Sequence, residues 1–458
     1  MILRKKTFLY PLCNVERIVR DYHGGFTVKA RFVIPALTVV VTAALTVPGP
    51  ALAAAVQRTE RVSVSSTGVA GDDWTIVGDL SANGRYVVFG TRAANLVAGD
   101  TNNADDVFLR DRRTGTTTRI SLAADGGEAD GDSSEPAISD DGRFVAFRSA
   151  ATDLVPGDTN GVADIFLLDR RSGATTRISV TADGTQADGD SGGVSISSDG
   201  RSVAFETVAS NLAPGAGTGN VLLHDRTTGG LSLVSVEDGG DGWASAGGSY
   251  WASISGNGRY VAFVSYEADM VPGDTNDSRD VFVRDLVAGT TTRASLTHDN
   301  QQAADFVGGP DVSDDGRYVT FWSEDPTLVE GDTNGSADVY LRDMQTRTTR
   351  AISSSPQGVI GDQPSADPRI TPDGRYVTFS GGATNLVAGD TNNADDVFVT
   401  DLRAGSTRIA SRASNGRQGN DHSFNGRSTP DGRTVVYGSF ATNLVRGGND
   451  QTHLYLTR

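Results

Sequence analysis

The stretch Ser139-Asp140-Asp141-Gly142-Arg143-Phe144-Val145-Ala146-Phe147 returns in closely related form along most of the chain. Its glycine marks a constant interval of 58 residues, at Gly84, Gly142, Gly200, Gly258, Gly316, Gly374 and Gly432. Self-similarity at a fixed period of this size is typical of arrays, solenoids and propellers. The sequence therefore predicts seven copies of one supersecondary unit.

Each repeat contains four short runs with turn residues between them. In the second repeat these runs cover 136–139, 143–149, 165–168 and 175–179, and we name them strands a, b, c and d. Asp141-Gly142 joins a to b, and this dipeptide favours a type I′ hairpin, which needs positive φ at both central positions. Four strands joined by short turns predict a four-stranded antiparallel sheet, the blade of a propeller.

Strand b carries the most regular apolar pattern. A valine is followed two residues later by an aromatic residue in all seven repeats, and a spacing of two places both side chains on one face. The residue between them is Val, Ala or Thr, small enough for another sheet to pack against the opposite face. Sheets buried on both faces fit radial stacking around an axis, so we predict an all-β, seven-bladed β-propeller. The pairs are Val87/Phe89, Val145/Phe147, Val203/Phe205, Val261/Phe263, Val319/Phe321, Val377/Phe379 and Val435/Tyr437.

The two ends of the repeat region indicate how the ring closes. Segment 58–64 matches strand d of the repeat, but no strands a to c precede it. The last repeat has strands a, b and c, ending at 453–458, and no strand d. We therefore predict that the N-terminal strand completes the last blade, and that residues 56–458 form one propeller.

The repeat Ser-x-Asp-Gly-Arg-Tyr-Val-x-Phe, followed by Asp-Val-Phe-x-x-Asp and a threonine-rich strand, resembles the WD-repeat-like, TolB-type β-propeller repeat. The resemblance covers residues 59–458. It implies a secreted or periplasmic seven-bladed propeller. It implies no single activity, because such repeats serve scaffolds, binding modules, gating domains of peptidases and some lyases. Neither the α/β domain of TolB nor a hydrolase domain is recognisable in the sequence.

Residues 1–55 lie outside the repeats and have the features of a signal peptide region. Lys29 and Arg31 precede an apolar run over 32–47, and small residues with an Ala51-x-Ala53 pattern follow. We expect secretion to the extracellular space and place the true translation start at Val28; the competing interpretation is a transmembrane anchor. The only cysteine, Cys13, lies in this region, so we expect no disulfide and no membrane anchor in the mature chain.

The chain is acidic, with a formal net charge of −17. An acidic surface repels nucleic acid and anionic membranes and attracts cations. We therefore expect no nucleic-acid partner. The long b–c and d–a connections share one face of the predicted propeller and are rich in acids, so we expect a protein, peptide or glycan ligand on this acidic loop face. We expect a monomer.

A charged column accompanies the turns at the opposite end of the blades. The turn arginine occurs in all seven repeats, and an aspartate ends strand c in six of them. Since b and c are antiparallel neighbours, we predict six intrablade ion pairs. The seventh blade has Arg458 in place of the aspartate and must differ.

The b–c connections carry the clearest candidate metal ligands. Gly-Asp-Thr-Asn occurs five times, each time followed by an aspartate just before strand c, and hard oxygen ligands on a short loop suit Ca²⁺. The alternative is that Asp and Asn only form side-chain turns, since the glycine and distal glutamate of EF-hand loops are missing. Ala216-Gly217-Thr218 and Gly448-Asn449-Asp450 replace the motif in blades three and seven. The predicted ligands are Asp100, Asn102, Asp106, Asp158, Asn160, Asp164, Asp274, Asn276, Asp280, Asp332, Asn334, Asp338, Asp390, Asn392 and Asp396.

A second candidate site lies in strand a, which is innermost in a propeller. One column reads Asp79, Ala137, Ser195, Ser253, Asp311, Arg369 and Arg427 around the ring. Arg369 and Arg427 on adjacent blades, flanked by Asp311 and Asp79, predict a site near the axis that grips an anionic ligand. The alternative is two charge pairs that tie these blades together.

No catalytic motif is present. The histidines of the repeat region fall at unrelated positions, and no nucleophile-elbow, zinc or phosphate-loop pattern occurs. Two function classes remain. The first is a secreted non-enzymatic propeller that binds a ligand or serves as a scaffold, stabilised by Ca²⁺. The second is a carbohydrate-active enzyme, a polysaccharide lyase or hydrolase, with an axial pocket.

Overall fold

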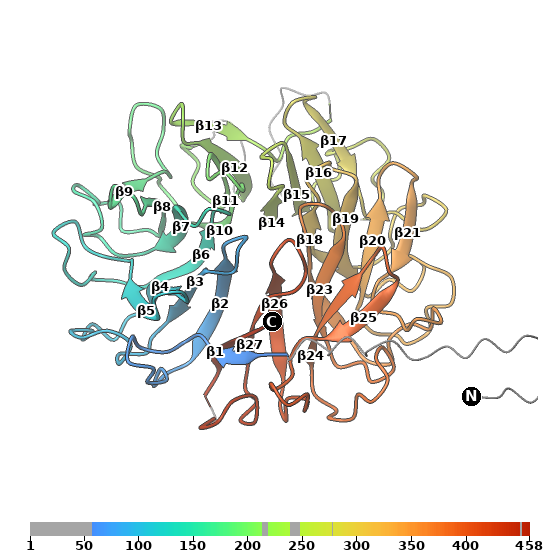
Figure 1. Cartoon of the computed structure of the whole chain (residues 1–458). Coiled ribbons are helices and arrows are strands. Elements are labelled where there is room, and N and C mark those ends of the chain that lie inside the picture. Colours follow the sequence, from blue (N-terminus) through green and yellow to red (C-terminus); the bar gives the residue numbers. More distant parts are fainter. Residues whose placement is uncertain (1–56, 213–218, 239–247, 277, 449–450) are drawn as a thin grey trace, which may run out of the picture. The chain divides into compact units, whose positions relative to one another are not determined.

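Each repeat folds as a four-stranded antiparallel sheet in the computed structural model, and seven sheets follow one another around a ring (Figure 1). The structure describes residues 57–212, 219–238, 248–276, 278–448 and 451–458. All of the regular elements in these residues are strands. No helix in the described part of the chain is long and apolar enough to cross a membrane. The predicted all-β, seven-bladed propeller is confirmed.

The strands are grouped here by their position in the blade. The innermost strands, a, are β2 (Thr75–Leu80), β6 (Ser133–Ile138), β10 (Ser191–Ile196), β14 (Ser249–Ile254), β18 (Val307–Val312), β22 (Ser365–Ile370) and β26 (Ser423–Ser428). The b strands are β3 (Tyr86–Thr91), β7 (Phe144–Ser149), β11 (Ser202–Thr207), β15 (Tyr260–Ser265), β19 (Tyr318–Ser323), β23 (Tyr376–Gly381) and β27 (Val435–Ser439). The c strands are β4 (Asp106–Asp111), β8 (Asp164–Asp169), β12 (Asn220–Asp225), β16 (Asp280–Asp285), β20 (Asp338–Asp343), β24 (Asp396–Asp401) and β28 (His453–Thr457). The outer strands, d, are β5 (Thr116–Arg119), β9 (Ala174–Arg177), β13 (Gly230–Leu233), β17 (Thr290–Arg293), β21 (Thr348–Ala351), β25 (Ser406–Ile409) and β1 (Thr59–Arg61).

Blades one to six each use four consecutive strands, from β2–β5 to β22–β25. The a–b pair of every blade contains the same register shift, as between Ser134 and Ala137 in blade two. The residue in this bulge has positive φ, for example Glu135 at 53°. A bulge strengthens the local twist, and here it recurs within strand a of every blade.

The core lies between the blades. The valine and the aromatic residue of strand b are fully buried, as Val145 and Phe147 illustrate with 0% exposure each. Phe147 stacks on Phe166 of strand c with ring centroids 5.9 Å apart. The small residue between them, Ala146, is equally buried on the other face. Both faces of each blade are therefore covered by apolar side chains, as the sequence pattern predicted.

The turn glycine is required for two reasons. Gly142 has φ of 72°, a conformation that side chains other than glycine rarely adopt. The ring of Tyr86 from the preceding blade also lies against it, so that an added Cβ would be 2.3 Å from a ring carbon. Arg85 and Arg170 both lie over the same ring, with their guanidinium carbons 4.5 and 4.1 Å from its centroid. The repeated glycine is thus a contact between neighbouring blades.

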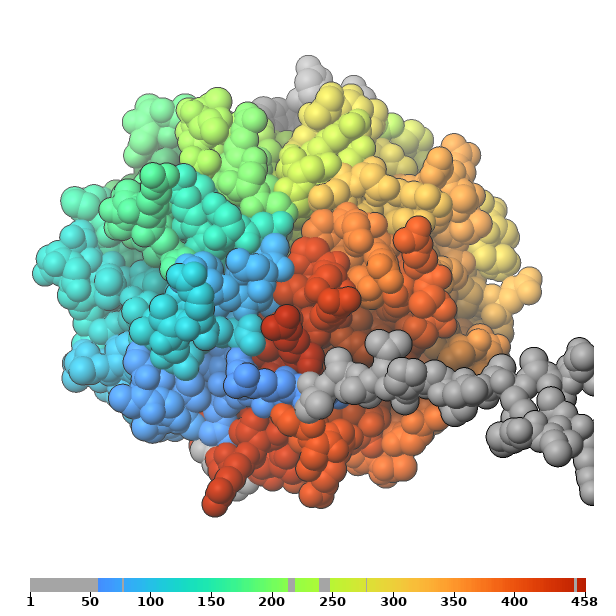
Figure 2. All heavy atoms as spheres, in the orientation of Figure 1, coloured from blue at the N-terminus to red at the C-terminus, as the bar shows by residue number. Residues whose placement is uncertain are grey.

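The ring closes through strand β1, as predicted. In the register of the last sheet Thr59 faces Thr457 and Arg61 faces Tyr455, and β1 becomes the fourth strand of blade seven. Val62 donates its backbone N–H to Leu454 at 2.7 Å, and its side chain is 1% exposed. Figure 2 shows the blue N-terminal segment lying against the red C-terminal blade.

The six predicted ion pairs at the turn end of the blades are present. The nitrogen–oxygen distances are 2.5 Å for Arg85–Asp111, 2.7 Å for Arg143–Asp169, 2.8 Å for Arg201–Asp225, 2.7 Å for Arg259–Asp285, 2.7 Å for Arg317–Asp343 and 2.9 Å for Arg375–Asp401. In the described part of blade seven, Arg433 forms one ion pair, with Asp431 at 3.9 Å, and both side chains are exposed. The predicted difference of the last blade is confirmed.

The predicted signal peptide region, with its start at Val28, lies outside the described residues. The same holds for Ala216-Gly217-Thr218 and for Asn449-Asp450. Predictions on these segments stay predictions.

Candidate functional site

A cavity of about 200 Å³ lies on the axis, lined by strands a and by the a–b hairpins. The four residues predicted as a ligand site, Asp79, Asp311, Arg369 and Arg427, all line it. They come from blades one, five, six and seven, and the ring places their strands side by side. The structure therefore brings the predicted residues together in one cavity.

The two aspartates of this cavity connect adjacent blades. Asp79 accepts a hydrogen bond from the backbone N–H of Ile138, in the next blade, at 3.1 Å. Asp311 accepts one from the N–H of Ile370 at 2.8 Å and one from the hydroxyl of Ser253 at 2.6 Å. These carboxylates are already used to satisfy buried donors, which is what a buried acid requires.

The two arginines have no such partners. Among the described residues, neither the Arg369 nor the Arg427 guanidinium has a hydrogen-bond acceptor or an ion-pair partner within 4.0 Å. Both side chains are half-buried and line the cavity. Burial, together with the charge of Arg427, lowers the pKa of Arg369 to about 10, so this guanidinium remains charged at neutral pH. Among the described residues, no ion pair within 4.0 Å joins these arginines to Asp79 or Asp311, although the two acids still act on Arg369 over a longer distance.

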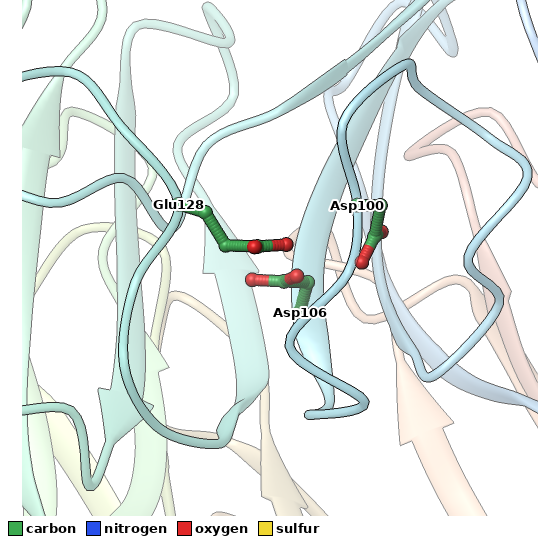
Figure 3. A group of neighbouring side chains, drawn as sticks. All are labelled: Asp100, Asp106 and Glu128. Atoms are coloured by element: carbon green, nitrogen blue, oxygen red, sulfur yellow. The ribbon is translucent and has the colours of Figure 1, made fainter.

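The acidic loops converge on one point in blade one. Figure 3 shows Asp100 from the b–c loop, Asp106 at the start of β4 and Glu128 from the d–a loop with their carboxylates directed toward one another. One ligand oxygen of each lies within 4.8 Å of the others, a spacing that could hold a metal ion. Burial raises the pKa of Asp100 to about 6.

An arginine of strand d occupies this cluster. Nη1 of Arg119 lies 2.8 Å from Asp106, 3.0 Å from Glu128 and 3.5 Å from Asp100. Its side chain is 7% exposed, so one internal cation already neutralises part of the cluster. A metal ion at this point must compete with the guanidinium.

Blades two and four repeat this arrangement with Arg177 and Arg293. The distances are 2.7 Å for Arg177–Asp158, 3.3 Å for Arg177–Asp164, 2.9 Å for Arg293–Asp274 and 3.5 Å for Arg293–Asp280. Blades five and six retain the acids but have Ala351 and Ile409 at the arginine position. The five predicted loops therefore fall into two classes.

The asparagines of the predicted metal set play one role in all five loops. Each amide nitrogen donates across to the backbone carbonyl of the d–a loop, and Asn334 does so to Gly361 at 2.8 Å. The others donate to Ala129, Ala187, Ala303 and Gly419. These contacts agree with the side-chain-turn interpretation and leave the carboxylates as the ligand candidates.

The sequence reasoning missed Arg119 and Glu128. A signal existed, because an arginine recurs at the end of strand d in 61, 119, 177 and 293 and is lost at 351 and 409.

A second overlooked feature is Arg279, whose guanidinium carbon lies 4.9 Å from the ring centroid of Trp251 and 5.0 Å from that of Phe306. The two rings are 41% and 46% exposed.

No family model matches the chain, and no curated protein matches it. Among solved structures, oligogalacturonate lyase from Vibrio parahaemolyticus is 14% identical, with a TM-score of 0.51, 88% of this chain covered and 96% of that one. The β-propeller domain of the Trilobed protease from Pyrococcus furiosus, described as having an open velcro topology, is 12% identical, with a TM-score of 0.51 and coverages of 84% and 94%. TolB from Acinetobacter baumannii is 17% identical with a TM-score of 0.35, and the match covers 60% of this chain and 53% of TolB.

Identities this low show the fold alone. The ring of this chain is closed by β1, in contrast to the open topology described for the archaeal domain. The protein is a seven-bladed β-propeller.

Proposed function

We propose that this protein is a secreted, non-enzymatic propeller that binds a small anionic ligand in its axial cavity. One observation carries the proposal: Arg369 and Arg427 line the cavity without an acceptor among the described residues, while Asp79 and Asp311 are bonded to the backbone of the next blade. Two adjacent guanidinium groups repel each other, and a carboxylate or phosphate between them would relieve that repulsion and accept charge-assisted hydrogen bonds.

The volume limits the ligand. Drug-sized ligands occupy pockets of roughly 300–1,000 Å³, and this cavity measures about 200 Å³. A small di- or tricarboxylate, a single acidic sugar or inorganic phosphate matches this volume better than an oligosaccharide does.

Calorimetric titration of the purified protein with citrate, galacturonate and inorganic phosphate tests the proposal. We expect binding by at least one of them, and a loss of affinity of roughly tenfold or more in Arg369→Ala or Arg427→Ala, since a charge-assisted hydrogen bond contributes about 1.5–3 kcal/mol. Arg403→Ala is the matched control, because Arg403 is an exposed arginine of the same blade as Arg369. Equal affinity in the cavity variants and the control would refute the axial site.

A carbohydrate-active enzyme has less support. Solved structures that share the fold include oligogalacturonate lyases. The described lining of the cavity, however, offers aspartates that are engaged in hydrogen bonds and no histidine or tyrosine for proton transfer. A turnover screen on polysaccharides, including oligogalacturonate, separates the two classes, and any reproducible turnover would favour the enzyme.

The proposal includes a structural role for Ca²⁺ in the acidic loops. Carboxylate oxygens gathered from two loops are the ligands that Ca²⁺ takes, and an ion bound only to the folded state raises the melting temperature. Melting in CaCl₂ and in chelator measures this role, and an unmoved melting temperature would leave the loops as structural turns.

Secretion, a monomeric state and a partner on the acidic loop face complete the proposal. Their support is the sequence: the leader pattern of 1–55 and the acidic composition. N-terminal sequencing of exported protein, light scattering and binding assays with peptide and glycan panels test them separately.

A further inference from the structure

We infer that blade five holds one divalent cation of the Ca²⁺ type between Asp332 and Asp338, at the position that an arginine side chain takes in blades one, two and four. The inference rests on the proposed structural role of Ca²⁺, and it reduces the candidate binding loops from five to the one in blade five. A cation and a guanidinium would then be alternative ways of neutralising the same pair of buried acids.

The repeats themselves supply the comparison. Where both acids and the strand-d arginine are present, the guanidinium contacts the first acid of the loop, at 2.7 Å in Arg177–Asp158 and 2.9 Å in Arg293–Asp274. Blade three lacks the acid at the start of strand c, where it has Asn220, and there Leu233 replaces the arginine. Acids and arginine thus vary together in blades one to four. Blades five and six keep the acids without the arginine, and blade seven keeps Arg61 but has His453 in place of the acid.

Blade five keeps its acids in a buried position without a cation. Asp332 is 8% exposed and Asp338 is 0% exposed, and neither forms an ion pair with a described residue. The Asp332 Oδ2 accepts the hydroxyl hydrogen of Tyr340 at 2.5 Å, but its buried Oδ1 has no hydrogen-bond partner. An unpaired buried carboxylate oxygen is costly, so a ligand is expected there.

In two other blades, the oxygen equivalent to Asp332 Oδ1 has a partner. The equivalent carboxylates, Asp158 and Asp274, direct an oxygen at the strand-d guanidinium. In blade five the residue at the position of that arginine is Ala351, and its side chain is too short to reach the point where the guanidinium lies in the other blades. Asp338 borders the same place and accepts hydrogen bonds from the Ser353 hydroxyl at 2.5 Å and the Asn334 amide at 2.6 Å.

Blade six has a neutral substitute that blade five lacks. The Gln418 amide donates to Asp390 at 2.9 Å and to Asp396 at 3.2 Å, so both acids have a shared donor. The equivalent of Gln418 in blade five is Ile360. Blade five is therefore the one acidic loop of the described chain with neither an arginine nor a glutamine between its acids.

Two carboxylates with water completing the shell suit a hard cation such as Ca²⁺, which takes 6–8 oxygen ligands.

The test uses the full chain at pH 7.5 with CaCl₂ as the probe. We expect one Ca²⁺ per chain by calorimetry and a melting temperature about 3 °C higher in CaCl₂ than in chelator.

Ala351→Arg, which copies blades two and four, should abolish the calcium response while melting in chelator at or above the wild-type temperature. Asp332→Asn should lower calcium affinity at least tenfold, and it serves as the second variant if Ala351→Arg does not fold. Asp390→Asn in blade six is the matched control and should keep the wild-type response.

Three results would overturn the inference. A wild-type protein without any calcium response removes the structural role of Ca²⁺ altogether. A response that survives in both Ala351→Arg and Asp332→Asn retains that role but places the ion elsewhere. A stoichiometry near five shows that the arginines do not exclude the metal.

Discussion

Blade seven and blade two contain the same four-stranded sheet, but they are held together in different ways. In blade two one continuous segment supplies all four strands, and Arg143 and Asp169 join strands b and c at the turn end. In blade seven the outer strand comes from the other end of the chain, and Arg433 has no strand-c aspartate to bind. In the last blade, therefore, only non-covalent contacts between the two ends of the repeat region hold the outer strand in the ring.

The largest effect should follow from deleting residues 56–66. The deletion removes β1, several backbone hydrogen bonds worth about 1 kcal/mol each, and the buried side chain of Val62, worth about 1.5–3 kcal/mol. We expect the free energy of unfolding to fall by at least about 5 kcal/mol, measured by denaturant melts. A chain that begins at Gln57 is the control, and a peptide of residues 56–66 should restore part of the loss. An unchanged melt would show that blade seven does not need its outer strand.

Acid should weaken blades one to six together. The hydrogen bond from the paired arginine lowers the pKa of the strand-c aspartate, to about 2 in Asp285 and Asp401. Because these folded-state values lie below the unfolded value of about 3.9, the stability they contribute is complete above pH 4 and is lost as the pH falls toward 2. Chemical denaturation at pH 5, 4, 3 and 2 should show a steepening loss. A flat profile over this range would mean that the six pairs contribute nothing.

The buried acids at the start of strand c should have the opposite effect on stability, and at a pH closer to neutral. Burial raises the pKa of Asp396 and Asp338 to about 6, above the unfolded value. Protonation then favours the folded state, so in chelator the melting temperature should rise slightly between pH 7.5 and pH 5. Differential scanning calorimetry measures it, and CaCl₂ should flatten the rise. A fall over this range would contradict the assignment.

The smallest effect on the melting temperature should come from removing the turn arginine of a single blade, in blade two, which has the ion pair, and in blade seven, which lacks it. Arg143→Ala removes an exposed ion pair of blade two, and we expect the melting temperature to fall by about 1–2 °C. Arg433→Ala in blade seven should leave the melting temperature unchanged, since the one acidic contact of Arg433 among the described residues is 3.9 Å away and exposed. Equal effects would mean that the turn arginine stabilises the hairpin and not the pair.

Most of the fold is readable from the repeat. The period, the Val-x-aromatic pattern and the incomplete last repeat predicted seven blades closed by the N-terminal strand, because each of these features is local and recurs seven times. The ion pairs at the turn end were also predictable, since b and c are neighbours joined in a simple register, with Phe144 opposite Asp169.

The sites were predictable only in part. The sequence brought Asp79, Asp311, Arg369 and Arg427 into one column, and it identified the acidic loops. Only the tertiary structure decided that the aspartates bond to the backbone of the next blade and leave the arginines unpaired, because the stagger between blades sets which group a carboxylate reaches. Only the structure placed Arg119 among Asp100, Asp106 and Glu128, because that contact depends on the pairing of β4 with β5 and on the d–a loop folding back over both.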